Sequence, residues 1–125
     1  MVINYNNQDL NLRRCVRVNM IYEDQFGQSF DPTNIKQRDM VNLFIAAVIA
    51  AQEYQGLPTS SKDEVMKWCD DNPISEYLIG QFGHQWVNDF KNYLSLVAEY
   101  NKSVEGKGTN EGASSKTVKT SKKKS

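Results

Sequence analysis

The stretch MVNLFIAAVIAA, Met40–Ala51, contains one polar side chain, Asn42, and no charge, although the rest of the chain is rich in Asn, Gln, Asp and Lys. A helix that spans a membrane needs about 20 mostly apolar residues. This run is shorter, because Arg38 and Asp39 precede it and Glu53 follows it. The run therefore predicts a buried helix or a helix that binds a partner, and it argues against a membrane span.

We expect the helix around this run to extend from about residue 36 to residue 55 and to end at Gly56. Its apolar residues cover more than one face, so nearly all of its circumference has to be covered. In a chain of 125 residues, part of that cover is expected to come from another molecule. The pattern leaves open which face is core and which is interface. The candidate partner-binding residues on this helix are Val41, Phe44, Ile45, Val48 and Ile49.

The N-terminal third predicts a short β-hairpin followed by a helix. Weak alternation of apolar residues favours strands at about 2–5 and 9–13, separated by the turn-forming sequence NNQD. Apolar residues then recur at helical spacing over about 14–26. Gly27 suits the left-handed position that closes a helix. The predicted fold is thus mostly α-helical, a small bundle of four to five helices with this hairpin at its N-terminus.

A third helix is predicted by its capping residues. Ser60 or Ser61 suits the N-cap, and Asp63 or Glu64 three residues later completes a capping box. Pro73 disfavours helical geometry in the residue before it and suits the first turn of the next helix. We therefore expect the third helix to end near residue 71.

The C-terminal helical region carries an aromatic stripe. Gly80 and Gly83 each weaken a helix by roughly 1 kcal/mol relative to Ala, so we expect a bend or break near Gly83 and a last helix over about 84–103. Such a stripe is ordinarily core, and the alternative is a groove-binding or oligomer surface. Trp86 and Phe90 are the second set of candidate partner-binding residues. The stripe comprises Phe82, Trp86, Phe90 and Tyr93.

Charge divides the chain in two, although its formal net charge is zero. Residues 106–125 hold six lysines, one acid and one large apolar residue. They cannot bury enough apolar surface to fold, which predicts a disordered Lys-rich tail after a helical domain over 1–105. That domain holds nine basic and fourteen acidic residues, a net charge of −5. An acidic body disfavours binding to a phosphate backbone.

Catalytic and metal-binding patterns are weak in this sequence. His84 is the only histidine, and no local signature pairs it with Cys15 or Cys69. One histidine and two separated cysteines do not make a standard zinc site, and GQFGHQ lacks the features of a phosphate-binding loop. We therefore expect no enzyme activity and no cofactor. The N-terminus lacks the pattern of a secretory signal, which favours reduced thiols in a cytosolic protein.

A basic cluster near the N-terminus supports a different hypothesis. Arg13, Arg14 and Arg17 lie close together and could bind phosphate, with the Lys-rich tail as a second contact. Glu23 and Asp24 follow within two helical turns, which favours a solvated face instead. The alternative function is a small helical nucleic-acid-binding or regulatory protein of a phage or mobile element, with nucleic acid as the less favoured partner.

The segment LRRCVRVNMIYEDQFGQSF, residues 12–30, resembles a pattern in small tail assembly chaperones of long-tailed phages and prophages. In that family a hairpin leads into a helix with a Tyr/Phe-Glu pair, followed by a Gly and a Phe. The matching residues here are Tyr22, Glu23, Gly27 and Phe30. The resemblance covers about residues 1–75 and includes the alanine-rich helix and the short capped helix.

The resemblance implies a non-enzymatic chaperone. Such a protein binds the hydrophobic tape measure protein and keeps it soluble while tail tube subunits polymerise around it. The implied partners are the tape measure protein and the tail tube protein, and self-association is a further expectation. The implied location is the host cytoplasm, with the chaperone absent from the mature virion.

Overall fold

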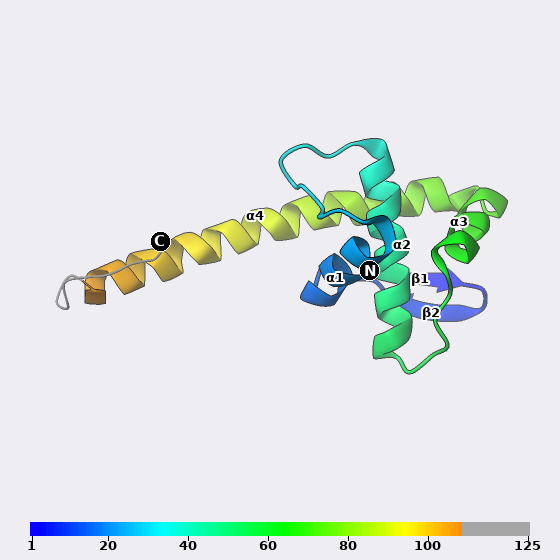
Figure 1. The fold of residues 1–125 in the computed structure, drawn as a ribbon, viewed down its shortest axis with the longest axis horizontal. Helices are drawn as coiled ribbons and strands as arrows, with labels where there is room; N and C mark the ends of the chain where they lie inside the picture. Colours follow the sequence, from blue (N-terminus) through cyan, green and yellow to red (C-terminus); the bar gives the residue numbers. More distant parts are fainter. Residues whose placement is uncertain (109–125) are drawn as a thin grey trace. The chain divides into compact units, whose positions relative to one another are not determined.

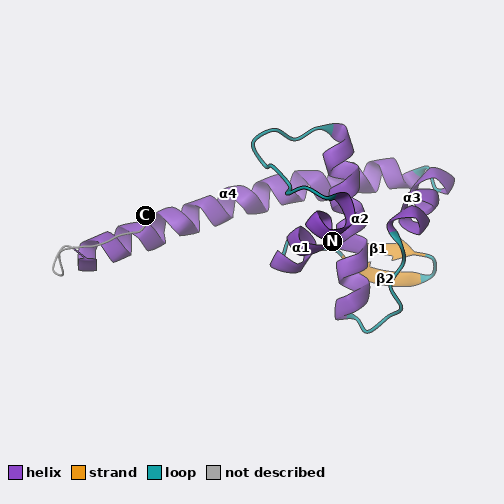
Figure 2. Ribbon diagram, in the orientation of Figure 1, coloured by secondary structure: helices purple, strands orange, loops and turns teal. Residues whose placement is uncertain are grey.

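The structure is a computed structural model that describes residues 1–108, and these residues are mostly helical. The chain divides into two compact units, Met1–Asp89 and a second unit that begins at Phe90. The predicted disordered tail begins within the last helix, which continues to Gly108, and its remaining residues, 109–125, lie outside the described part. The elements are β1 (Val2–Tyr5), β2 (Gln8–Asn11), α1 (Val16–Phe26), α2 (Gln37–Tyr54), α3 (Lys62–Asp71) and α4 (Ile74–Gly108) (Figures 1 and 2).

The predicted hairpin is confirmed. Strands β1 and β2 pair antiparallel, with Ile3 opposite Leu10. Asn6 and Asn7 form the turn with φ of 48° and 64°, a left-handed conformation that asparagine tolerates and that two-residue hairpins favour. Ile3, Tyr5 and Leu10 are buried, so one face of this two-stranded sheet lies on the core.

Local sequence signals also fix the ends of two helices as predicted. Gly27, with φ of 74°, closes α1, and its N–H donates to the Glu23 carbonyl oxygen at 2.9 Å. Ser61 caps α3, because its Oγ accepts from the Glu64 N–H at 3.1 Å. The Glu64 carboxylate in turn accepts from the Ser61 N–H at 2.7 Å, which completes the capping box.

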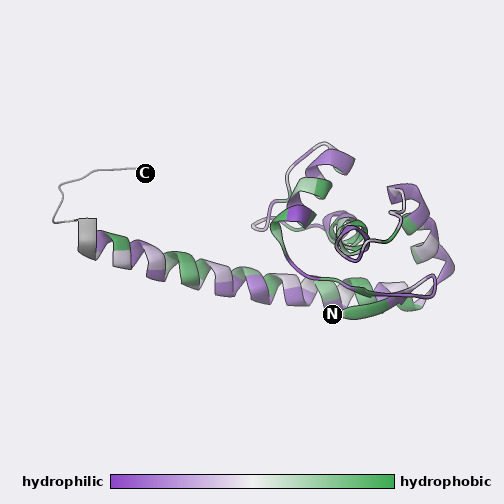
Figure 3. Ribbon diagram, turned by 90° about the horizontal axis from the view of Figure 1, so that it is seen from below, coloured by the Kyte–Doolittle hydropathy of each residue, from purple (hydrophilic) through white to green (hydrophobic). Residues whose placement is uncertain are grey.

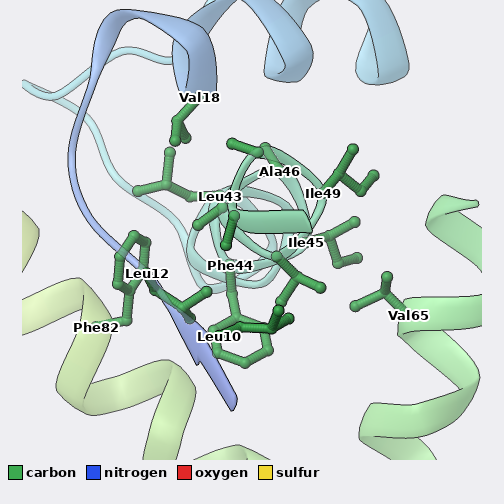
Figure 4. Packing of buried hydrophobic residues seen from close by; sticks show 14 of the residues in the cluster. Leu10, Leu12, Val18, Leu43, Phe44, Ile45, Ala46, Ile49, Val65 and Phe82 are labelled. Carbon is green, nitrogen blue, oxygen red and sulfur yellow. The ribbon is translucent and has the colours of Figure 1, made fainter. Parts of the chain in front are cut away.

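Helix α2 lies at the centre of the first unit. In Figure 4 its apolar side chains point in several directions around the helix. They meet residues from the hairpin region, α1, α3 and α4. A helix that is apolar all round is stable in water only when it is covered in this way. The covering residues labelled in the figure are Leu10, Leu12, Val18, Val65 and Phe82.

Helix α4 is continuous from Ile74 to Gly108, so the predicted break near Gly83 is wrong. Phe82 and Trp86 of this helix are buried in the core. Burial of a large apolar side chain stabilises by about 1.5–3 kcal/mol, so burial of these two residues exceeds the roughly 1 kcal/mol that each helical glycine costs. Gly83 also leaves room for the Met40 side chain, because a Cβ at residue 83 would overlap the terminal methyl group of Met40.

The two glycines give a matched pair of substitutions. Gly80 is exposed and has open space around it, so Gly80→Ala is expected to raise the free energy of unfolding by about 0.5–1 kcal/mol through helix propensity alone. Gly83→Ala should gain less, because the Met40 side chain has to move. Urea titration followed by circular dichroism measures both values. A lower stability of Gly80→Ala than of the parent would contradict the helix at this residue.

Candidate partner-binding surface

The candidate partner-binding residues of α2 belong to the core. Val41 is half-buried and packs against the core cluster. The other four are no more than 5% exposed, namely Phe44, Ile45, Val48 and Ile49. The expectation that this helix offers an apolar face to another molecule is therefore corrected, since its own chain buries residues 42–52 on every face of the helix. The sequence pattern left this choice open, and the covering elements decide it.

Trp86 and Phe90, the second pair of candidates, have different environments. Trp86 is 3% exposed and belongs to the core of the first unit. Its candidacy as an accessible contact is therefore corrected as well. Phe90 begins the second unit, where it is half-buried and stacks on Tyr93 with ring centroids 6.0 Å apart. Of the seven candidates, only Phe90 lies in the second unit.

Aromatic rings link the helices and the loop of the first unit in a chain. Tyr22 packs on Phe30 at 5.6 Å between ring centroids, and Phe30 packs on Trp86 at 5.6 Å. Trp86 then meets Phe82 at 6.1 Å, and Phe82 meets Phe44 at 6.3 Å. The tilted and edge-to-face orientations are the favoured ones for aromatic pairs. This series of ring contacts attaches the loop after α1 to α1, α2 and α4.

The residues that carry the family resemblance act at this loop. The Tyr22 hydroxyl donates to Asp39 at 3.3 Å, and the same carboxylate accepts from the Lys36 N–H at 3.0 Å at the start of α2. Burial, followed by the nearby Asp39 charge, raises the pKa of Tyr22. Glu23 accepts from the Ser29 hydroxyl at 2.9 Å. These residues thus have a structural role, which is to close the loop onto α1 and α2.

The most exposed run of large apolar residues lies on the second unit's part of α4. Leu96 and Tyr100 are 64% and 68% exposed, and Tyr93, Leu94 and Val104 are each about half exposed. At 100° per residue, all of these except Leu96 fall within an arc of about 120°. Hydrophobic and hydrophilic residues alternate along this helix in Figure 3. We call this set the α4 stripe, and it comprises Phe90, Tyr93, Leu94, Leu96, Val97, Tyr100 and Val104.

Most of the α4 stripe was not identified from the sequence. The signal that could have identified it is the length of the helix compared with its neighbours. Helix α4 has 35 residues, whereas α2, the next longest described helix, has 18. At 1.5 Å per residue these lengths are about 53 Å and 27 Å. Apolar residues continue along α4 as far as Val104. A helix of about 27 Å can cover only part of a helix of about 53 Å, so the apolar residues of the later turns of α4 are left uncovered.

The first unit also has an apolar groove, with a volume of about 430 Å³. It lies between the start of α2 and the early turns of α4. Ile35 and Met40 line one side, and Ile79, His84 and Val87 line the other, with Gly80 and Gly83 between them. The groove involves only the start of α2 and a few turns of α4, whereas the α4 stripe extends over residues 90–104. The groove is therefore a secondary candidate for apolar contact.

A polar hollow of about 620 Å³ lies beside the loop after α1. Its charged lining residues are Asp31, Lys36, Arg38 and Asp39, so both signs of charge are present. The Thr33 hydroxyl and N–H both donate to Asp31, at 2.6 and 2.9 Å, and these bonds lower the pKa of its carboxyl. Asp39 is already used by Tyr22 and Lys36. Both carboxylates of the hollow thus already accept hydrogen bonds from within the chain.

Cys69 and His84, two of the residues considered for catalysis, lie in different environments. Burial raises the pKa of the Cys69 thiol to about 11, so this group is protonated at neutral pH and is a poor nucleophile. His84 is exposed, and no hydrogen bond within residues 1–108 joins it to either cysteine. No group of three or more metal-ligating side chains occurs in the described part of the chain.

The three N-terminal arginines each contact a neighbour within the first unit. Arg17 donates two hydrogen bonds to Glu53, at 2.7 and 3.0 Å. The hydrogen bond from Arg17 is the main cause of a lowered pKa at Glu53. The guanidinium of Arg13 lies 4.9 Å from the Tyr54 ring centroid. The guanidinium of Arg14 lies 5.4 Å from the Trp86 ring centroid. Their contacts run toward the protein, which disfavours a phosphate-binding patch.

Within residues 1–108, no helix has the length and apolar character required to cross a membrane. Comparison with known proteins gives no family assignment. No family model matches the chain, and neither the curated proteins nor the solved structures include a match.

Proposed function

We propose that this protein is a non-enzymatic tail assembly chaperone, which binds apolar helices of a tape measure protein and keeps that protein soluble during tail tube assembly. The observation that carries the proposal is the exposed α4 stripe. Contiguous apolar patches of more than a few hundred Å² on a protein surface mark interaction sites. The resemblance at residues 12–30 supports the class of partner.

The binding energy would come from burial of the α4 stripe against the partner helix. A fully exposed aromatic side chain offers about 150–250 Å², so the exposed parts of the stripe amount to several hundred Å². At about 25 cal/mol per Å² this area contributes several kcal/mol before the costs of association. One such contact is weak, and many copies bound along one long client gain strength through avidity.

Charge and location complete the proposal. The body over residues 1–105 has a net charge of −5, which keeps many copies soluble when they are crowded on one client. The tail tube protein is the proposed second partner, because it must displace the chaperone from the client. The site of action is the host cytoplasm, and the mature virion lacks the chaperone.

The alternative, a nucleic-acid-binding regulator, has weaker support. It needs Arg13, Arg14 and Arg17 to face a phosphate backbone. These side chains instead contact Tyr54, Trp86 and Glu53. Binding to DNA or RNA that falls steeply with added salt would favour this alternative.

Co-expression with the tape measure protein from the same genome tests the proposal. The native chain is expected to raise the soluble fraction of the tape measure protein, and Leu96→Asp and Tyr100→Asp are each expected to reduce this rescue several-fold. Ser95→Asp is the matched control, since Ser95 is exposed on the same helix but outside the stripe. Circular dichroism establishes that all three variants stay helical.

Three results would contradict the proposal. The first is a genome without a tape measure gene. The second is a native chain that leaves the tape measure protein insoluble. The third is full rescue by both stripe variants, because the client would then bind elsewhere.

A further inference from the structure

The apolar residues of the second unit follow a heptad repeat. Phe90, Tyr93, Val97, Tyr100 and Val104 are separated by three, four, three and four residues in turn. An average spacing of 3.5 residues is typical of the a and d positions of a coiled coil. Phe90, Val97 and Val104 take the a positions, and the two tyrosines take the d positions. All five lie in one unbroken helix.

A repeat of 3.5 residues selects a particular kind of partner. A straight α-helix has 3.6 residues per turn, so the seam drifts by about 20° per heptad and stays buried only against a helix that supercoils with it. The occupant of the stripe is therefore another helix with the same period. Valine at two of the three a positions, Val97 and Val104, suits a two-stranded coiled coil.

The charges around the seam are compatible with pairing between identical helices. The positions that flank the seam, e and g, hold Leu94, Leu96, Asn101 and Ser103, none of which is charged. The charged residues Lys91, Glu99, Lys102 and Glu105 take b, c and f positions, away from the seam, and their charges sum to zero. Two copies can thus meet along this face without like charges in contact. A partner with charged flanks would find no opposite charge here.

We propose that residues 90–105 of two copies of this chain pair through the seam formed by Phe90, Tyr93, Val97, Tyr100 and Val104. Leu94 and Leu96 extend the buried area on either side of the seam. The apolar area of several hundred Å² per copy falls below the roughly 800 Å² per partner of a standard stable interface. The dimer therefore dissociates on dilution, and a client helix competes with the second copy for the same surface.

Sedimentation of the full chain without any client, over roughly a hundredfold range of concentration, tests this inference. The native chain is expected to sediment as a monomer at the lowest concentration and as a dimer at the highest. Val97→Asp should weaken pairing at least about tenfold, and Tyr100→Leu should preserve or strengthen it, because leucine at d packs well in dimers. Ser95→Asp, at an f position, should pair like the native chain.

The outcomes separate clearly. A native chain that stays monomeric throughout, a mass of three or more copies, or pairing unchanged by Val97→Asp would overturn the inference. Circular dichroism of Val97→Asp at high dilution shows whether the first unit stays folded. The sedimentation experiment contains no client. A monomeric result would therefore overturn the pairing inference without contradicting the proposed chaperone function, and a dimeric result would not depend on that function.

Discussion

Phe44→Ala is expected to lower the free energy of unfolding by about 3–5 kcal/mol, the usual cost of truncating a buried phenylalanine. Phe44 is 0% exposed, lies on the central helix α2 and packs edge-on against Phe82. Removal of its ring leaves a cavity among residues from several elements, and close-packed cores relax only partly around such a cavity. This loss is a large part of the 5–15 kcal/mol that stabilises a typical domain.

Urea unfolding followed by tryptophan fluorescence measures this change, because Trp68 and Trp86 are both buried in the same unit. Tyr77→Ala is the matched control, since Tyr77 is 62% exposed on α4. Its effect is expected to stay within about 0.5 kcal/mol, the usual range for surface substitutions. If Phe44→Ala unfolded at the same urea concentration as the native chain, Phe44 would be a surface residue and its place in the core would be wrong.

The second large effect is expected at Gln52, a buried polar residue on α2. Gln52 is 2% exposed. Its side-chain oxygen accepts from the Ser60 N–H at 2.8 Å, and its side-chain nitrogen donates to the Ser60 hydroxyl at 3.1 Å. The Tyr5 hydroxyl donates to the same Ser60 oxygen at 3.0 Å. This network fixes the loop before α3 to both the hairpin and α2.

Gln52→Leu keeps a similar side-chain volume but removes both hydrogen bonds between Gln52 and Ser60, whereas the hydrogen bond from Tyr5 to Ser60 stays. The Ser60 N–H is then left without its acceptor in a partly buried site, which costs about 1–3 kcal/mol. Differential scanning calorimetry of the two proteins measures the loss as a lower Tm. Gln85→Leu, at an exposed position of α4, is the control for the change in side-chain chemistry. Equal Tm values for Gln52→Leu and the native chain would show that the network adds nothing to stability.

Local signals allowed most of the elements to be predicted from the sequence. The NNQD turn and its flanking apolar residues gave the hairpin, and Gly27 and Ser61 gave helix ends that the structure confirms. These features depend on residues within one or two turns of each other, so the backbone preferences of Asn, Gly and Ser determine them.

The features that were predicted wrongly depend on contacts between distant parts of the chain. The periodicity of α2 is the same whether its apolar faces meet its own hairpin or another molecule, so the partner-binding residues could not be located by pattern alone. The continuity of α4 through Gly80 and Gly83 depends on the burial of Phe82 and Trp86. Only the three-dimensional packing shows that this burial exceeds the cost of the two glycines.

The division between core and α4 stripe also has an evolutionary consequence. Within residues 1–108, the core residues lie before Phe90, whereas the stripe lies from Phe90 onward. Substitutions in the stripe are therefore expected to leave the core of the first unit and its stability unchanged. Under the proposed chaperone function, selection by a rapidly diverging client could then act on the stripe through neutral intermediates that still fold.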